Sequence, residues 1–517
     1  MKLYDLMVIG GGINGAGIAR DAAGRGLSVL LCEKDDLAAH TSSASTKLIH
    51  GGLRYLEYYE FGLVRKALQE REVLLKAAPH IIWPLRFVMP HDQAQRPEWM
   101  IRCGLFLYDH LAKREVLPAS QTISFAKHPS GAPLKAAFKR GFVYSDGWVQ
   151  DARLVVLNAM AAAEHGARIL TRTACVAARR AGEHWLCTLQ HADGRQEQVS
   201  ARALVNAAGP WVESLLKDTL QLPSPKSIRL VKGSHIVVNK LFDHPYAYIF
   251  QNPDKRIIFA IPYEQDFTLI GTTDVEYHGD PGAVAIAADE VDYLCRMSNR
   301  YFNSQIGPDD VLSTYSGVRP LLDDEASNAS SVTRDYALEL DAAGAPMLSV
   351  FGGKITTYRK LAEEAVDRLA PLLGNGQPTW TAGVPLPGGD MPNADAAAFL
   401  TASQQRHPWL PAALLQRYVK TYGTRLHTLI GSARSLAELG AEILPGVYEA
   451  ELRYLVDQEW AVSADDILWR RSKLRLHLPA HAGTVLDGWL QQYWAGKGDA
   501  GQRLSTGAAW LQESKVD

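Results

Sequence analysis

The start of this chain constrains its fold more than any other stretch, because it has the order strand, glycine turn, helix, second strand. The apolar run 6–9 leads into Gly10, Gly12 and Gly15, which fit the spacing G-x-G-x-x-G. In that pattern the first glycine turns the chain, the second lets the backbone approach a pyrophosphate, and the third lets the helix pack on the strand. The helix N-terminus then presents free N–H groups to the phosphates. The stretch therefore predicts a Rossmann-type dinucleotide-binding unit; a glycine turn without a ligand is the lesser alternative.

The second strand, 27–32, ends at Glu33, near the acidic position that holds a ribose 2′-hydroxyl in such units. A carboxylate there favours adenosine over a 2′-phosphorylated ribose. The pattern alone does not separate NAD from FAD.

Three later segments have the composition of a ligand wall. Residues 41–46 all carry hydroxyls except Ala44, which suits a polar ligand better than a core, although a solvated loop has the same composition. The strand 203–206 ends in small residues that permit close approach of a ligand. A second strand, glycine and helix junction at Gly352-Gly353 again aims backbone N–H groups at a negative centre.

Composition narrows the function class. A chain of 517 residues can bury more than one core, and a formal net charge of −2 disfavours bulk binding to nucleic acid. The 5 cysteines are scattered and lack zinc-ligand spacing, which predicts a reducing compartment and no metal site. No apolar run approaches a membrane span, so any membrane association is expected to be peripheral. No signal peptide is expected, because strand-forming residues and the glycine turn begin at once.

The pattern of polar and apolar residues changes twice along the chain. It becomes β-rich with alternating polarity from about residue 230, and helical after the linker-like segment 385–393. Helices are expected at 61–76, 411–422 and 448–459, and Ser463 to Asp466 has the spacing of a capping box. The basic residues Arg470, Arg471, Lys473 and Arg475 are interpreted as a solvated face.

The predicted fold is α/β, with a Rossmann-type domain interleaved with a mixed β-sheet substrate domain and a small all-α C-terminal domain. The expected boundaries are 1–80, 145–215 and 345–375 for the dinucleotide-binding domain, 81–144 and 216–344 for the substrate domain, and 390–517 for the helical domain.

Several cationic and hydrogen-bonding residues lie in polar or glycine-rich settings: Arg54, Tyr55, His235, Arg319, Arg334 and Lys354. Cations that converge on one pocket repel each other unless an anion lies among them, so a phosphorylated or carboxylated substrate is predicted. The alternative is that each arginine pairs with a structural carboxylate.

Six motifs together resemble one known family. They are the glycine turn 10–17, the segment 41–55, Lys232-Gly233-Ser234-His235, residues 270–274, residues 315–320 and residues 351–360. This set is similar to the aerobic, FAD-dependent sn-glycerol-3-phosphate dehydrogenases, flavoproteins of the glycine/D-amino-acid-oxidase-like superfamily. The resemblance covers essentially the whole chain.

The resemblance implies noncovalent FAD and oxidation of sn-glycerol 3-phosphate to dihydroxyacetone phosphate. It also implies electron delivery to membrane quinone by a homodimer bound peripherally to the anionic inner face of the cytoplasmic membrane. It assigns catalysis to His235 and Arg319, either of which could be the base, and substrate binding to Arg54, Tyr55, Arg334 and Lys354. The implied FAD-binding residues are Gly10, Gly12, Asn14, Gly15, Glu33, Thr41, Ser42, Ser45, Thr46, Lys47, Leu48, His50, Val176, Ala208, Gly209, Gly352, Gly353, Lys354, Ile355 and Thr356.

Two segments are candidates for membrane contact: the aromatic and basic stretch from Trp83 to Arg114, and Tyr358 to Leu361. Partly buried aromatic residues beside solvated arginines explain the first stretch equally well.

Three other functions share some of these features. A glycerol-3-phosphate oxidase would use the same pocket with oxygen as acceptor. A flavoprotein that modifies tRNA would need a strongly basic surface, which the net charge disfavours. A flavin-binding subunit without turnover would not need cations opposite the flavin.

Overall fold

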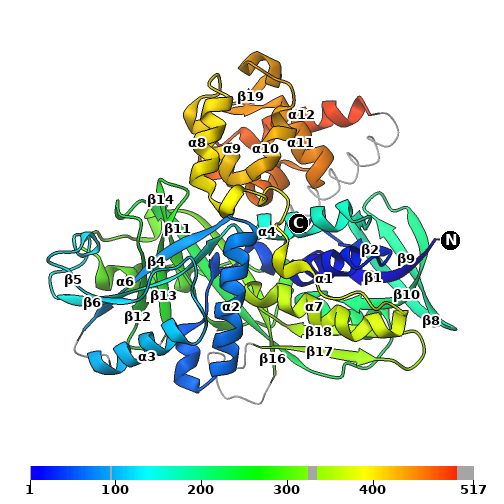
Figure 1. The fold of residues 1–517 in the computed structure, drawn as a ribbon, viewed down its shortest axis with the longest axis horizontal. Helices are drawn as coiled ribbons and strands as arrows, with labels where there is room; N and C mark the ends of the chain where they lie inside the picture. Colours follow the sequence, from blue (N-terminus) through cyan, green and yellow to red (C-terminus); the bar gives the residue numbers. More distant parts are fainter. Residues whose placement is uncertain (1, 93–95, 255, 324–334, 498–517) are drawn as a thin grey trace.

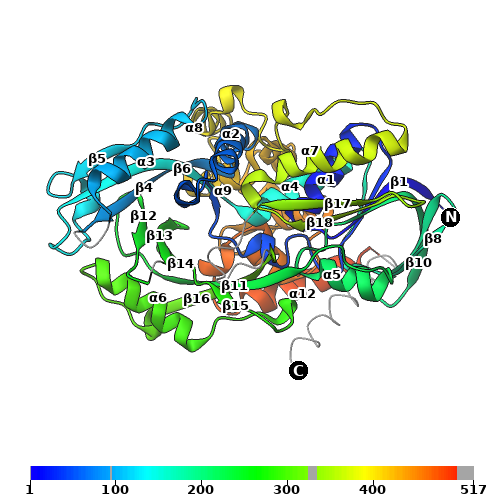
Figure 2. The same ribbon diagram turned by 90° about the horizontal axis from the view of Figure 1, so that it is seen from below.

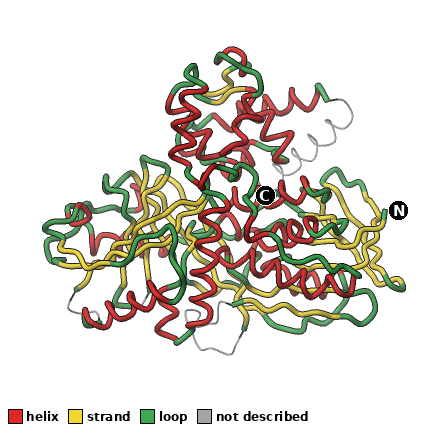
Figure 3. Tube along the Cα trace, in the orientation of Figure 1, coloured by secondary structure: helices red, strands yellow, loops and turns green. Residues whose placement is uncertain are grey.

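Two β-sheets lie side by side in the computed structural model, and a helical domain caps them at one side (Figure 1). The structure describes residues 2–92, 96–254, 256–323 and 335–497. Figure 3 shows the separation of strand-rich and helix-rich regions along the trace. The α/β architecture predicted from the sequence is confirmed.

The first sheet is built around β1 (Leu3–Ile9), which pairs in parallel with β2 (Val29–Cys32) and β10 (Gln196–Asn206). The strand order is β17-β18-β10-β1-β2-β7, with the antiparallel hairpin β8-β9 attached to β10. The other strands are β7 (Arg168–Leu170), β8 (Thr173–Ala181), β9 (His184–His191), β17 (Tyr336–Asp341) and β18 (Met347–Gly352). The parallel strands β1, β2, β10 and β18 have their carboxyl ends at one edge, where a ligand site is expected.

Three helices cover one face of this sheet: α1 (Ile13–Gly24), α4 (Asp151–Glu164) and α7 (Tyr358–Leu369). They approach closely because small residues face the contact. A Cβ on Gly17 would lie 2.8 Å from the ring of Tyr358, and Asn158 Nδ2 donates a hydrogen bond of 3.0 Å to the Tyr358 hydroxyl.

The second sheet has the order β15-β11-β14-β13-β12-β4-β6-β3, with β16 paired to β11 and β5 paired to β6. Figure 2 shows it beside the first sheet, with α6 (Ala288–Tyr301) beneath it and α2 (Phe61–Ala77) and α3 (Glu98–His110) above. Its strands are β3 (Leu48–Ile49), β4 (Ile82–His91), β5 (Gln121–Ser124), β6 (Arg140–Val149), β11 (Ile228–Asn239), β12 (Ala247–Gln251), β13 (Ile257–Tyr263), β14 (Phe267–Gly271), β15 (Val275–Glu276) and β16 (Val311–Leu322).

Sheet membership departs from the expected boundaries at three points. Strand β3 and the end of β6 belong to the second sheet, and β17 belongs to the first. Strand β3 and the end of β6 pair with each other across about a hundred residues, which local patterns do not reveal, whereas β17 forms a hairpin with its sequence neighbour β18. We keep the three-part division as a proposal with these strands reassigned.

The C-terminal domain is mainly helical. It contains α8 (Ala396–Arg406), α9 (Ala412–Tyr422), α10 (Leu426–Ile430), α11 (Glu449–Glu459), α12 (Ala482–Ala495) and the short pair β19 (Glu442–Leu444) and β20 (Val447–Tyr448). The capping box is present, because Asp466 N–H donates to Ser463 Oγ and Ser463 N–H donates to Asp466 Oδ2. The segment that follows, Asp466–Arg471, is a π-helix. No helix within the described ranges is long and apolar enough to cross a membrane.

Candidate active site

The glycine turn between β1 and α1 has the close approaches that its spacing predicts. Gly10 has a φ of +113°, and a Cβ on Gly15 would lie 1.9 Å from the Gly10 carbonyl oxygen. Gly12 is less crowded, since a Cβ there would meet only Ser42 Oγ at 3.2 Å. The first and third glycines are therefore required by the fold, whereas the second leaves an open approach to the N-terminus of α1.

Glu33 lies beside this turn. Its carboxylate accepts hydrogen bonds from Gly11 N–H at 2.6 Å and Asp35 N–H at 2.8 Å. Burial raises the pKa of the Glu33 carboxyl, while the two amides oppose that shift. The residue lines the same cavity as Gly10 and Gly12, in the place expected for a ribose contact.

The hydroxyl segment joins the two sheets. Ser42 Oγ accepts from Ile13 N–H at 3.0 Å, and Thr41 Oγ1 donates to the Val318 carbonyl of β16 at 2.7 Å. Thr46 Oγ1 lies 3.0 Å from His235 Nε2. The segment is thus a wall of the cavity and not a solvated loop: Thr41, Ser42, Ser45, Thr46, Leu48 and His50 all line it.

Lys47 differs from its neighbours. Its side chain is buried and its Nζ lies 2.9 Å from Asp151 Oδ1, with a further hydrogen bond to the Ser43 carbonyl. It is not among the residues that line the cavity. The Lys47 side chain therefore forms a structural ion pair, because a buried ammonium needs a buried partner, and a contact of this residue with the cofactor stays a proposal.

Val176 stays a proposed cofactor contact, and the structure shows where its side chain lies. The neighbouring residues Thr173, Ala174 and Cys175 line the cavity, but Val176 does not and is 41% exposed. The register of the β8-β9 pair shifts between Cys175 and Ala177. Val176 is the extra residue of this irregularity, which alters the direction of its side chain.

The Gly352-Gly353 junction faces α1. The two residues have φ of +75° and +104°, and Asn14 Nδ2 donates to the Gly352 carbonyl at 3.2 Å. Asn14 Oδ1 is buried without a hydrogen-bond partner among the described residues. Ala208, Gly209, Lys354, Ile355 and Thr356 line the cavity here, together with Asn14 and both glycines.

These features fit a flavin dinucleotide. The cavity measures about 1000 Å³ and runs without a break from the glycine turn past the Gly352 junction to the second sheet. Two helix-leading glycine junctions, an open Gly12 and an unpaired Asn14 oxygen are all present in its wall. A ligand with phosphates and a polar ring system would supply the missing partners.

The predicted cations gather at the other end of this cavity. Arg54, Tyr55, Lys354 and Arg319 line it together with His235, while Arg334 lies outside the described residues. Lys354 Nζ lies 4.0 Å from the centre of the Tyr55 ring. Arg319 Nη2 lies 2.8 Å from Asp274 Oδ1 and donates to the Thr273 carbonyl at 3.0 Å, so this arginine does pair with a carboxylate while it faces the cavity.

His235 is held by its strand and its neighbours. Its ring stacks on Tyr315 at a centroid distance of 4.7 Å, and Gly271 on the adjacent strand leaves room for the ring. Burial lowers the pKa of His235 well below its ordinary value, and the charges of Lys47 and Arg319 add to this effect. The imidazole is therefore neutral near pH 7.

Sequence reasoning missed the apolar end of the cavity. Phe87, Met89, Ile249, Ile257 and Phe259 line it opposite Tyr58, Met100, Ile101 and Leu107. Asp274 and Tyr315 stood within the motifs 270–274 and 315–320, but their roles as partners of Arg319 and His235 were not predicted. Alternating apolar residues in β4, β12 and β13 were a signal for a sheet face, but nothing local in them indicates a cavity.

The two candidate membrane segments differ in how far their side chains are exposed. Arg359 is buried with Glu70 and Glu363, and Tyr358 and Leu361 are also buried. Within the segment 358–361 only Lys360 is exposed, and it pairs with Glu363, so the segment has no apolar surface to offer a membrane. By contrast α3, at the periphery of the molecule in Figure 1, exposes Trp99 (64%) and Phe106 (61%) with Met100 and Leu107, beside Tyr59 (81%). These four α3 residues and Tyr59, called the α3 patch below, form an uncovered apolar surface next to the apolar end of the cavity.

Comparisons with known families match nearly the whole chain. Residues 5–359 match the family described as FAD dependent oxidoreductase. Residues 379–491 match the family described as C-terminal domain of alpha-glycerophosphate oxidase.

Individual relatives are also similar over most of their length. The chain is 56% identical to a glycerol-3-phosphate dehydrogenase from Pseudomonas aeruginosa, covering 95% of each chain. It is 53% identical to a D-erythritol 1-phosphate dehydrogenase from Brucella abortus, covering 92% of this chain and 95% of the relative. A crystal structure of a glycerol-3-phosphate dehydrogenase from Bacillus halodurans complexed with FAD has a TM-score of 0.77 at 27% identity, covering 98% of this chain and 94% of that one.

Proposed function

The chain belongs to the FAD-dependent oxidoreductase family, and from this premise we propose that it oxidises sn-glycerol 3-phosphate to dihydroxyacetone phosphate. The observation that carries the proposal is one cavity that is lined both by the glycine turn of a dinucleotide-binding unit and by Arg54, Arg319, Lys354 and the neutral His235. A relative with the same printed activity at 56% identity supports it.

The chain would hold FAD with residues from both glycine junctions. Gly10, Gly12 and the N-terminus of α1 suit the phosphates, and Glu33 suits a ribose hydroxyl. Asn14, Gly352, Gly353 and Thr356 suit the flavin end, by their place along the cavity. When bound, FAD supplies the acceptor for the hydride that leaves the substrate carbon.

The residues around the substrate divide into two roles. His235 is neutral, so it can take up the proton of the substrate hydroxyl as the C–H bond breaks. Arg319 is already paired with Asp274, which keeps it a cation and makes it an anchor for negative charge and not a base. This division favours His235 over Arg319 as the base.

Arg54, Lys354 and Tyr55 suit the phosphate of the substrate. Lys354 rests over the Tyr55 ring, which directs its ammonium group without neutralising it. Turnover assays with sn-glycerol 3-phosphate and with unphosphorylated glycerol test this assignment. We expect turnover with the phosphate ester only, and a higher KM with little loss of kcat in Lys354→Met. Equal activity on both alcohols would contradict it.

A second substrate deserves the same assay, because a relative at 53% identity is named for D-erythritol 1-phosphate. That ester places a phosphate and an oxidisable secondary alcohol on a four-carbon chain. The ratio of kcat/KM for the two esters decides between them. A ratio in favour of the four-carbon ester would replace glycerol 3-phosphate as the substrate.

We propose membrane quinone as the electron acceptor and a peripheral position on the inner face of the cytoplasmic membrane. The α3 patch supports this, since it offers an apolar surface that includes residues at the apolar end of the cavity. The exposed Arg96 and Lys113 come just before and after α3, where they pair with Glu57 and Glu115. An oxygen-using oxidase would share the pocket, so turnover with a soluble quinone and with oxygen as the alternative acceptors separates the two.

Flotation with vesicles that contain anionic lipid tests the membrane position. We expect Trp99→Ser with Phe106→Ser to abolish flotation while turnover with a soluble dye is retained. Leu372→Ser is the matched control, because Leu372 is also exposed but lies outside the patch. Flotation of the double variant like the wild type would rule out the patch as the membrane contact.

We also propose a homodimer, and light scattering in detergent would test this oligomeric state.

A further inference from the structure

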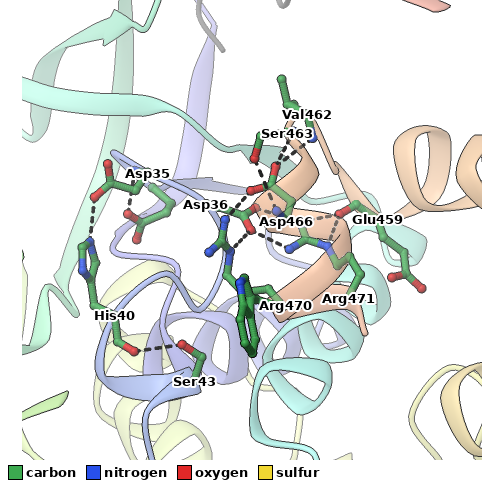
Figure 4. Close-up of polar contacts among 12 residues, drawn as sticks. Asp35, Asp36, His40, Ser43, Glu459, Val462, Ser463, Asp466, Arg470 and Arg471 are labelled. Atoms are coloured by element: carbon green, nitrogen blue, oxygen red, sulfur yellow. Dashed lines mark hydrogen bonds and ion pairs between the residues drawn. The ribbon is translucent and has the colours of Figure 1, made fainter. Parts of the chain in front are cut away.

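The C-terminal domain contacts the dinucleotide-binding half through buried charges (Figure 4). Arg470 and Arg471, on the π-helical segment of that domain, both bind Asp36 in the loop that follows β2. Arg470 Nε lies 2.6 Å from Asp36 Oδ2. Arg471 donates from Nη1 to Asp36 Oδ2 at 2.6 Å and from Nη2 to Asp36 Oδ1 at 2.7 Å. Asp36 is 3% exposed. The basic run predicted to be a solvated face is thus directed inward at these two positions, which corrects that interpretation.

Both arginine side chains are also held by groups of the C-terminal domain itself. Arg471 donates twice to the Glu459 carbonyl, at 2.9 and 2.7 Å, and Arg470 is paired with Asp466. Burial alone would raise the pKa of Asp466, but the charges of Arg172, Arg470 and Arg471 hold it well below its ordinary value. The carboxylate stays ionised, so the donors are pre-organised on a rigid part of the C-terminal domain.

The loop that they hold forms part of the dinucleotide site. Glu33, Ala38, Ala39, His40 and Thr41 line the cavity on either side of Asp36. The loop is tied to the glycine turn from within, because Ala38 N–H donates to the Gly11 carbonyl at 3.2 Å and Gly11 N–H donates to Glu33. Arg172, between β7 and β8, also holds the loop, because its N–H donates to the Asp35 carbonyl at 2.7 Å and its guanidinium lies 3.8 Å from Asp36 Oδ1. From the C-terminal domain the loop is held by Arg470 and Arg471 at Asp36. We call Asp36 with Arg470 and Arg471 the Asp36 clamp.

We propose that the Asp36 clamp allows the C-terminal domain to slow the release of FAD, because the clamp holds the loop 33–41 closed over the adenosine end of the bound cofactor. The inference rests on the proposed function only in taking FAD as the ligand. When one side of the clamp is removed, the charge on the other side stays buried without its partner. The loop is then expected to open, because opening lets water solvate that charge. Asp36 is then a positioning residue: its loss speeds FAD release and leaves the chemistry at His235 intact.

The test compares FAD release from four purified holoenzymes, the wild type and three variants. Release is followed as the rise in flavin fluorescence after dilution, and the Kd for FAD is measured by reconstitution. For Asp36→Asn, which keeps the size of the side chain, we expect release about ten-fold faster or more. Arg470→Gln should show a smaller increase, because Arg471 still holds Asp36, and it serves if Asp36→Asn fails to fold. With saturating FAD, kcat should stay within about two-fold of wild type.

Arg417→Met is the matched control. Arg417 on α9 forms an ion pair with the buried Glu451 on α11, so its loss destabilises the same domain without touching the loop 33–41 or the groups that hold Arg470 and Arg471. It should lower the Tm with no change in FAD release. Wild-type release in both clamp variants would overturn the clamp, and so would release that rises in all three variants in proportion to lost Tm. A wild-type protein that takes up no FAD would overturn the proposed function together with the clamp.

Discussion

At the scale of single residues, the proposed chemistry depends on the surroundings of His235. Sequence reasoning left His235 and Arg319 as rival bases, because nothing near either residue in the chain indicates its protonation state. The structure supplies the missing partners: Asp274 pairs with Arg319, while Tyr315 and Thr46 enclose the imidazole. These partners come from distant segments, so only the fold separates the two roles.

The first prediction concerns the base. His235→Gln should lower kcat about 100-fold or more, since positioned proton transfer contributes about 10²–10⁴-fold. The amide keeps a polar group near Thr46 but cannot take up a proton at neutral pH. FAD content and the KM for glycerol 3-phosphate should change little in stopped-flow and steady-state assays. A kcat within a few-fold of wild type would remove His235 from the proposed chemistry.

At the scale of elements, the turn from β1 into α1 positions one end of the site and needs its glycines for different reasons. Gly15 is packed against the Gly10 carbonyl, whereas Gly12 faces only Ser42 Oγ. The close packing of Gly15 is therefore required for folding, whereas the space beside Gly12 is open to a ligand. Substitution of each by alanine therefore separates stability from binding.

The second prediction uses that pair. Gly15→Ala should destabilise the protein strongly, because its Cβ would lie 1.9 Å from a backbone oxygen and α1 would have to move off the strand. Gly12→Ala should keep nearly the wild-type Tm of the apoprotein while its affinity for FAD falls. Thermal melts of the apoproteins and FAD titrations measure both effects. Equal loss of Tm in the two variants would contradict the assignment.

Elements with local signals were predictable from the sequence. The helix expected at 61–76 spans Phe61–Ala77, and the one expected at 411–422 spans Ala412–Tyr422, since apolar spacing and a terminating proline or glycine fix both. Features set by distant pairing were not predictable. The partner of Lys47 is Asp151, 104 residues away, and the shift at Val176 depends on the register of β9.

At the scale of the whole molecule, the helical domain is joined to the rest by packing as well as by charge. His80, just before β4, lies between the linker residue Gly388 and Gly423 at the end of α9. The ring is 1% exposed, and neither nitrogen has a hydrogen-bond partner in the part of the chain that the structure describes. Burial lowers the pKa of His80 to about 3, and the charge of Arg153 adds to this.

The third prediction is a pH dependence of stability. The unfolded chain protonates this imidazole near pH 6.5, but the folded chain does so only near pH 3, so stability falls as the pH drops below 6.5. Between pH 7.5 and 5.5 the contribution of His80 to this fall is about 1.4 kcal/mol. His80→Leu should lose that much less than wild type in urea unfolding at the two pH values. Equal losses in both proteins would contradict the neutral, buried state of His80.

The measurement that tests the central claim most directly is the visible spectrum of the purified holoenzyme without oxygen, before and after sn-glycerol 3-phosphate is added. The account predicts that the flavin band near about 450 nm is lost with the phosphate ester and is retained with glycerol. A yellow protein whose band is unchanged by the ester would contradict the proposed substrate, and a protein that takes up no FAD would contradict the site itself.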